Sequence, residues 1–279
     1  MLKILIFGGG IMVDTKELYW IGNEDMSLNS HTIKTCGEIT LGYYGGNSEN
    51  GAYKNEDGAM ILCSSDNAWK FALLLDAHTT SESANLILET IKGEQCKLEQ
   101  ILHMSIINLS TQLHNFFLNI FNNEEFKEKC KCINGETACL IVIQKEQYLW
   151  WMSIGDNLVY LLHPELEELN QFALNQRQFY EWIGKVNTFE LDIPCYTTGT
   201  RLLREGQNYI YLLTDGVLEC GNRQFEDTKL LYKVFTENID VPQNISKVLK
   251  EVHKQKGRDS ATIIGWSYFN KHKAQRPSG

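Results

Sequence analysis

The sequence contains few of the residues that are typical of linkers between domains. Only four of its 279 residues are proline, and no stretch rich in Ser and Gly or in charge interrupts it. Such stretches are typical of flexible linkers, so nothing here indicates a domain boundary. We therefore expect one domain over residues 1–279, with a frayed basic tail at 271–279.

The eight cysteines are too scattered to form a recognisable framework. No C-x-x-C pair is present, which excludes the common zinc spacings, and the density is far below that of a disulfide scaffold. The close pair Cys130 and Cys132 is interpreted as two unrelated thiols near a loop. The apolar segment 1–7 is too short to span a membrane and lacks the long apolar core of a signal peptide. We expect a soluble, reduced, cytoplasmic protein.

An excess of positive charge is also missing. The chain has 26 Lys and Arg against 35 Asp and Glu, a net charge of −9. This balance argues against broad binding to nucleic acid or to anionic membranes, because both require cations to neutralise phosphates. Gly8–Gly10 follow an apolar segment but lack the G-x-G-x-x-G spacing of a dinucleotide loop. Walker A, H-E-x-x-H and G-x-S-x-G motifs are absent too.

Short β-rich segments alternate with segments of helical period. With 43% hydrophobic and 22% charged residues, the composition is that of a folded chain. Residues 164–207 have no clear period and are predicted to form an irregular flap or a lone helix around 176–183. Strands joined by hairpin-length connections, with helices between groups of them, predict an α+β fold of antiparallel sheets. The predicted strands are 59–64, 70–76, 137–143, 148–153, 158–163, 208–213 and 261–268, and the predicted helices are 81–93, 98–121, 227–236 and 244–256.

Aspartates recur where apolar strands begin or end. Asp76 and Asp215 follow apolar strands, Asp156 lies in the turn after another, and Asp57 and Asp259 precede strands. A single aspartate in such a place is ordinarily a turn residue. Five of them around one sheet edge would repel one another unless a cation neutralised them. Oxygen-only ligands select hard ions, so the pattern predicts a Mg²⁺ or Mn²⁺ site.

The same residues resemble a known family. The chain segments 55–57, 75–78, 135–138, 154–156, 213–216 and 259–262 occur in the order and at the spacing of the motifs of the metal-dependent serine/threonine protein phosphatases, the PPM or protein phosphatase 2C-like family. The resemblance covers residues 40 to 268. It implies a four-layer α-β-β-α sandwich of two antiparallel sheets flanked by helices. It also implies a centre of two Mn²⁺ or Mg²⁺ ions at one end.

The resemblance implies the metal ligands residue by residue. Asp76 resembles the carboxylate that bridges both metals, and the backbone carbonyl of Ala77 resembles a further ligand of one of them. Asp215 and Asp259 resemble the ligands that complete the other metal. Asp156 resembles the ligand of a weaker third metal found in some members.

The resemblance also implies the reaction. Glu56 and Asp57 resemble the acids that hold metal-bound waters, and His78 resembles the general acid. The implied activity is hydrolysis of phosphoserine and phosphothreonine in proteins. A hydroxide between the two cations attacks phosphorus in line, while protonated His78 supplies a proton to the leaving oxygen. The implied partners are phosphorylated proteins in signalling; no sequence feature sets the oligomeric state.

Three positions depart from the family pattern. Members carry an arginine four residues before the Glu to hold the substrate phosphate, and that position here is Ala52. Lys54 is the nearest cation, although a point charge does not replace a bidentate guanidinium. Ala77 replaces a glycine, and Ser260 replaces an asparagine. None of these changes removes a carboxylate ligand, so they bear on substrate affinity more than on metal binding.

Two other functions are compatible with the sequence. A catalytically weak or inactive relative, used as a regulatory or binding module, is favoured by Ala52 and opposed by the retained acids. A metal-dependent hydrolase of small phosphoesters or nucleotides is the other alternative. A metal-dependent assay with an aryl phosphate separates the first from an enzyme. Comparison of phosphopeptides with nucleotides separates the second.

Overall fold

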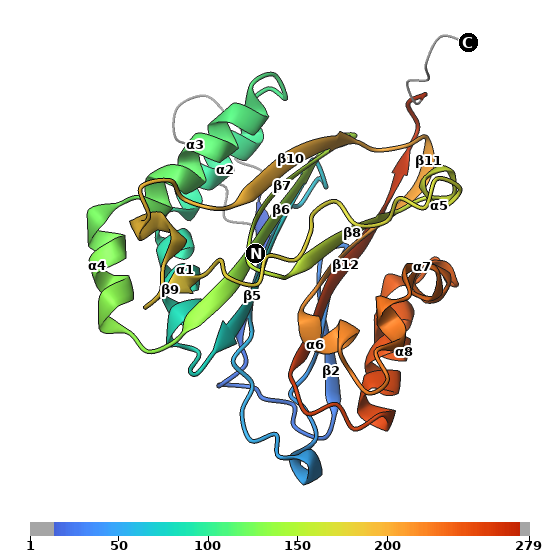
Figure 1. Ribbon diagram of the computed structural model, residues 1–279. Coiled ribbons are helices and arrows are strands. Elements are labelled where there is room, and N and C mark those ends of the chain that lie inside the picture. The colour runs from blue at the N-terminus through green and yellow to red at the C-terminus, as the bar shows by residue number, and fades with distance from the viewer. Residues whose placement is uncertain (1–13, 274–279) are drawn as a thin grey trace.

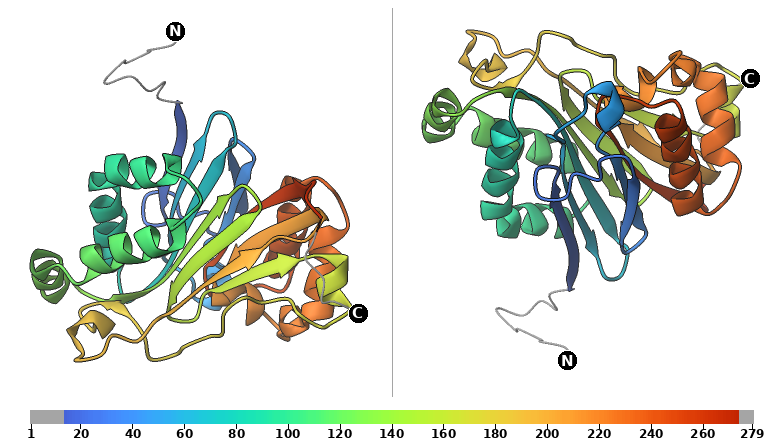
Figure 2. Two further views of the ribbon diagram at one scale, coloured as in Figure 1. Left: turned by 90° about the horizontal axis from the view of Figure 1, so that it is seen from above. Right: turned by 90° about the horizontal axis from the view of Figure 1, so that it is seen from below.

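Two antiparallel β-sheets face each other and carry helices on their outer sides (Figure 1). This computed structural model describes residues 14–273. The apolar segment 1–7, Gly8–Gly10 and the tail residues 274–279 lie outside the described residues. The predicted α+β architecture is confirmed, including the order of helix, sheet, sheet and helix across the molecule (Figure 2).

The larger sheet has seven strands in the order β1-β4-β5-β6-β7-β10, with β9 paired to β6. Its long central strands are almost wholly buried because helices cover one face and the second sheet covers the other. Its strands are β1 (Thr15–Ile21), β4 (Gly58–Ser64), β5 (Trp69–His78), β6 (Glu136–Lys145), β7 (Tyr148–Ile154), β9 (Ile183–Gly184) and β10 (Thr197–Leu202).

The smaller sheet has five strands in the order β2-β3-β12-β11-β8. Every neighbouring pair in it is antiparallel, although only β2 and β3 are joined by a hairpin-length connection. Its strands are β2 (His31–Cys36), β3 (Ile39–Tyr44), β8 (Leu158–Leu162), β11 (Gly206–Leu213) and β12 (Ala261–Asn270).

Helices cover the outer face of each sheet, so three apolar cores stack across the molecule. One core lies under α1–α4, one between the sheets and one under α7 and α8. Figures 1 and 2 show the two helical groups on opposite sides. The helices are α1 (Glu82–Gly93), α2 (Gln95–His103), α3 (Leu109–Phe121), α4 (Glu124–Cys132), α5 (Pro164–Glu167), α6 (Asp215–Leu218), α7 (Thr228–Thr236) and α8 (Val241–Lys254), with 3-10 turns at Ser48–Asn50, Thr188–Glu190 and Gln224–Glu226.

The single helix predicted over 98–121 is wrong. The chain forms α2 and α3 with a break between them, and Asn108 before α3 has a left-handed φ of 66°. The buried ammonium of Lys145 donates to the carbonyls of Leu102 and Met104 at the end of α2. These carbonyls are the acceptors that an uninterrupted helix would have used, so a distant lysine ends the helix here.

The lone helix considered around 176–183 is also wrong. Residues 168–182 form no helix, and the first half of the predicted flap contains only the short α5 and the two-residue strand β9. The strands β1, β2, β3, β9 and β10 and the helices α4, α5 and α6 were not predicted. Cys130 and Cys132 lie in the last turn of α4, and none of the eight cysteines, all of which lie in 14–273, forms a disulfide. No helix within 14–273 is long and apolar enough to cross a membrane.

Candidate metal centre

Strand register brings the predicted aspartates to one edge of both sheets. Gly58 at the start of β4 pairs with Leu75 near the end of β5, so Asp57 and Asp76 lie side by side. In the other sheet β11 ends at Leu213, which pairs with Ile263 near the start of β12. Asp215 and Asp259 therefore lie at the corresponding edge, because the end of one antiparallel strand lies beside the start of its neighbour.

Two glycines allow the close backbone approach that this edge needs. A Cβ on Gly216 would lie 1.8 Å from the carbonyl oxygen of Ser260, so only glycine lets α6 pack against the start of β12. Gly155 has a φ of +89°, and a Cβ there would lie 2.5 Å from that of Ala138. Each glycine adjoins an aspartate of the site, Asp215 and Asp156 respectively.

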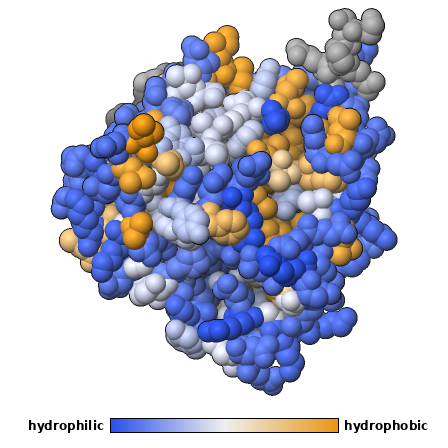
Figure 3. Space-filling model, in the orientation of Figure 1, coloured by the Kyte–Doolittle hydropathy of each residue, from blue (hydrophilic) through white to orange (hydrophobic). Residues whose placement is uncertain are grey.

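A polar cavity of about 680 Å³ opens beside this edge. The face around and below α6 is predominantly hydrophilic (Figure 3). The lining mixes acids with cations, a composition suited to a charged ligand near metal ions. The lining residues include Lys54, Glu56, Ala77, His78, Lys256, Arg258, Asp259 and Ser260.

Asp57 joins the two sheets from a fully buried position. It directly precedes β4, and its carboxylate accepts hydrogen bonds from Ser260 Oγ at 2.9 Å and from the hydroxyl of Thr262. Burial raises the pKa of Asp57 to about 7. Ser260, which replaces the asparagine of the family pattern, thus donates a hydrogen bond from its hydroxyl to an acid of the site.

The carboxyl of Asp76 lies among four other acids of the site. Asp76 is 6% exposed, and burial raises the pKa of its carboxyl well above the ordinary value. The charges of Asp57, Asp215, Asp259 and Asp156 raise that pKa further. Its carboxylate makes no hydrogen bond or ion pair with the residues that the structure describes. A buried carboxylate among four others is costly unless a cation compensates it.

The other predicted acids lie nearby with different exposures. Burial raises the pKa of Asp215 to about 6, and the charge of Asp156 contributes to the rise. Asp156 is buried, whereas Asp259 is exposed on the cavity wall. Glu56 pairs with Lys54 Nζ at 2.5 Å through one oxygen, while its buried Oε1 has no hydrogen-bond partner within 14–273.

These donors fit a hard divalent cation. They are carboxylate oxygens, and one of them, Glu56 Oε1, is buried without a hydrogen-bond partner within 14–273. The acids of this region outnumber the cations that could balance them. Among residues 14–273, no three His, Cys, Asp or Glu side chains are already gathered as a metal site.

His78 and Ala77 end β5 beside these acids. The imidazole of His78 is exposed and packs edge-on against Trp182, with ring centroids 5.0 Å apart. The backbone of Ala77 pairs with Thr137 of β6. Lys54 donates to the carbonyl of Thr79 at 3.0 Å in addition to its pair with Glu56. The structure therefore brings all nine predicted site residues to one end of the sandwich.

Two cations at the site were not predicted. Arg177, in the irregular segment after α5, contacts both Asp156 and Asp215. Arg258 lines the cavity beside Asp259 and makes no side-chain hydrogen bond or ion pair in the described part of the chain. Arg177 lies in the stretch 164–207, which has no clear period, and Arg258 lies just before the motif 259–262, so neither position is part of a motif.

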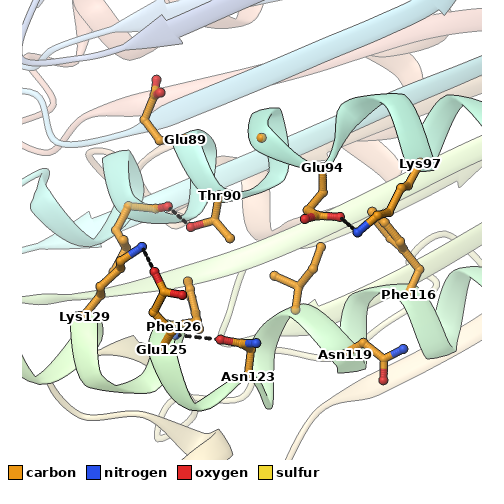
Figure 4. Close-up of a pocket in the computed structure, with 13 residues that line it drawn as sticks. Glu89, Thr90, Glu94, Lys97, Phe116, Asn119, Asn123, Glu125, Phe126 and Lys129 are labelled. Atoms are coloured by element: carbon orange, nitrogen blue, oxygen red, sulfur yellow. Dashed lines mark hydrogen bonds and ion pairs between the residues drawn. The ribbon is translucent and has the colours of Figure 1, made fainter.

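A second cavity, of about 570 Å³, lies between α1, α3 and α4 (Figure 4). Charged side chains at its rim pair with each other: Glu94 with Lys97 at 2.6 Å, and Glu125 with Lys129 at 2.8 Å. Because these charges are already balanced, this cavity lacks the uncompensated acids of the first one. We place the functional site at the acidic edge.

Comparison with known proteins identifies the fold. No family model matches the sequence, and no curated protein matches it. Among solved structures, a bacterial serine phosphatase has 12% identity and a TM-score of 0.60, covering 86% of this chain and 100% of its own. The serine/threonine phosphatase Stp1 from Staphylococcus aureus has 11% identity and a TM-score of 0.58, covering 96% and 99%. RsbX in complex with magnesium has 13% identity and a TM-score of 0.50, covering 85% and 100%.

Proposed function

The chain has the fold of the PPM phosphatases, and from this we propose that it is a metal-dependent phosphatase of phosphoserine and phosphothreonine in proteins. The observation that carries the proposal is the pair of buried acids Asp57 and Asp76, adjoining Asp215 and Asp259 across two sheets at a cavity. The similar structures support it, because two of them are named a serine phosphatase and a serine/threonine phosphatase, and the third, RsbX, was solved in complex with magnesium.

The described carboxylates would hold two Mn²⁺ or Mg²⁺ ions. We assign Asp76 as the bridging ligand, the carbonyl of Ala77 as a ligand on one side, and Asp215 and Asp259 as ligands on the other. When bound, the ions supply positive charge beside the phosphoryl group and a nucleophile at neutral pH. Asp57, fixed by Ser260 and Thr262, orients water at this centre.

His78 is suited to donate a proton to the leaving oxygen. Its ring is exposed at the cavity wall, and the edge-on contact with Trp182 restricts its orientation. A serine or threonine oxygen leaves poorly as an alkoxide, so a positioned acid speeds the reaction. Glu56 pairs with Lys54 beside the cavity, and its second oxygen is buried without a hydrogen-bond partner within 14–273.

Substrate phosphate would bind cations on the cavity wall. Lys54 is already paired with Glu56, and Lys256 pairs with Glu49 at 2.7 Å. Arg258 keeps its charge unpaired within 14–273 and offers a planar guanidinium, which suits phosphate. We therefore assign Arg258 as the main phosphate contact and Lys54 as a weaker one.

A metal-dependent turnover assay tests the proposal. Phosphoserine and phosphothreonine peptides are incubated with the purified chain, with Mn²⁺ or Mg²⁺ and then with a chelator. We expect turnover that requires the metal and is lost in Asp76→Asn, because the bridging position needs charged oxygens toward two cations. Turnover that persists with chelator, or near-normal turnover in Asp76→Asn, contradicts the two-metal assignment.

A regulatory or binding module is the second candidate. Two observations favour it: Ala52 stands where the family's phosphate-binding arginine is found, and Arg177 occupies two of the acids. Such a module binds phosphopeptide without turning it over at any metal concentration, which the same assay reveals. The eight unpaired thiols support a cytoplasmic location for either function.

A further inference from the structure

Arg177 reaches the acidic edge from an irregular segment and contacts three carboxylates. Its Nη2 lies 3.1 Å from Asp156 Oδ2 and 3.2 Å from Asp215 Oδ2. Its Nη1 lies 2.7 Å from Glu219 Oε1. Two carboxylate oxygens from different sheet connections thus converge on a single nitrogen, which marks a point where one positive charge is stabilised.

The guanidinium is held in place and largely withdrawn from solvent. The side chain of Arg177 is 15% exposed, and its buried Nε has no hydrogen-bond partner within 14–273. The ring of Phe179 lies 4.7 Å from its Cζ, and the neighbouring Gln178 donates its backbone N–H to the carbonyl of Gly155 at 3.1 Å. A buried cation with an unsatisfied donor is costly, so the surrounding acids must compensate it.

We propose that Arg177 is an internal counter-cation that fills the cation position between Asp156 and Asp215 and competes there with a divalent ion. The inference rests on the proposed metal centre. A guanidinium and a metal ion cannot both occupy the point at which the two carboxylate oxygens converge. A metal ion can therefore bind at Asp215 only when Arg177 withdraws. At Asp156 the arginine takes the place of the metal ion that this carboxylate would otherwise hold.

Metal binding and thermal stability in variants of Arg177 test this competition. Mn²⁺ binding is measured by calorimetry, and unfolding is followed with Mn²⁺ and with chelator. Arg177→Met removes the charge and keeps much of the length; Arg177→Lys keeps one charge without the fork. Arg204→Met is the matched control, since Arg204 also pairs with a carboxylate, that of Glu165, away from the acidic edge.

Arg177→Met is expected to lower the melting temperature without metal and to raise the affinity for Mn²⁺. With chelator, Arg177→Met melts at a lower temperature than the wild type, because Asp156 and Asp215 lose their counter-charge. Its Mn²⁺ affinity at the weakest site rises roughly 10-fold or more, within the range for residues that tune metal ligands. Arg177→Lys should have a melting temperature and a Mn²⁺ affinity between those of the wild type and Arg177→Met. Arg204→Met leaves Mn²⁺ affinity unchanged.

The outcomes separate this inference from the proposed function. If the wild type binds Mn²⁺ and Arg177→Met binds it equally or more weakly, Arg177 is only a structural residue and the inference is overturned alone. If neither protein binds Mn²⁺ or Mg²⁺, the proposed metal centre itself is overturned, and the inference with it. Should Arg177→Met fail to fold, Arg177→Lys gives the same comparison of affinities.

Discussion

At the scale of single residues, the site depends on acids that are expensive to bury. Asp57 is fully enclosed, and its hydrogen bonds to Ser260 and Thr262 come from the opposite sheet. Asp76 lacks even such partners in the part of the chain that the structure describes. The sequence could predict these acids because aspartates recur directly before or after apolar strands, where their charges would repel one another. It could not predict Arg177, which lies in the stretch 164–207 without a clear period and outside every motif.

Replacement of His78 should affect substrates according to their leaving groups. His78→Ala is expected to lower kcat on phosphoserine peptides by roughly 10²–10⁴-fold, the range for a positioned proton donor. The loss on an aryl phosphate should be clearly smaller, since an aryl oxide carries its charge without protonation. Steady-state kinetics on both substrates measure this. Equal losses would refute the proton-donor role and leave the metal centre intact.

Two cations of the cavity wall should differ in their effect on substrate binding. Arg258→Ala is expected to raise KM for a phosphopeptide with a smaller change in kcat, the signature of lost uniform binding. Lys54→Ala should raise KM less, because Glu56 already neutralises this lysine. The kinetics of the two single variants decide between them. A larger KM effect for Lys54→Ala would reverse the assignment of the phosphate contact.

At the scale of elements, strands were easier to predict than the connections that shape the site. The buried strands β4, β5, β11 and β12 read clearly because their apolar runs end at turn residues and acids. The break between α2 and α3 depends on Lys145, which is 43 residues from Leu102 and 41 from Met104 in sequence. Apolar spacing continues across this break, so local periodicity predicts one helix where tertiary contacts produce two.

The contact between α6 and β12 gives a prediction for Gly216. In Gly216→Ala the new Cβ would meet the carbonyl of Ser260 at 1.8 Å, so α6 must move away from β12. We expect a loss of about 1–3 kcal/mol in the free energy of unfolding, the usual cost of overpacking. Mn²⁺ affinity should fall as well, because Asp215 moves with α6. Gly93→Ala is the matched control, since nothing lies within 4 Å of its added Cβ.

Chemical denaturation and calorimetry of the two glycine variants check this. Gly93→Ala should keep both stability and metal affinity within experimental error of the wild type or gain slightly, as alanine favours a helix. Loss of stability in Gly216→Ala with unchanged Mn²⁺ affinity would show that Asp215 does not depend on this approach.

At the scale of the whole molecule, the acidic edge stores electrostatic repulsion that should appear as pH-dependent stability. The pKa values of Asp57 and Asp215 in the fold are about 7 and about 6, above the ordinary 3.8. Between about pH 4 and about pH 7 the folded state therefore binds more protons than the unfolded state. The free energy of unfolding must then decrease as pH rises through this window.

With chelator present, we expect a decrease on the order of 4 kcal/mol between about pH 5 and about pH 8. Asp57→Asn should flatten the profile, because it removes the group with the pKa of about 7. Urea unfolding at a series of pH values measures the slope. A profile that rises over this window in the metal-free protein would contradict the raised pKa values.

Metal binding should stabilise both sheets together, because the proposed ligands come from both. Asp76 ends a strand of the larger sheet, whereas Asp215 and Asp259 adjoin strands of the smaller one. An ion that binds only the folded state adds about 2.7 kcal/mol at 100 times its Kd. Amide exchange with Mn²⁺ should therefore slow in β5 and in β11 alike, and Asp76→Asn should lose the effect in both. Protection confined to one sheet would show that the metal site does not join them.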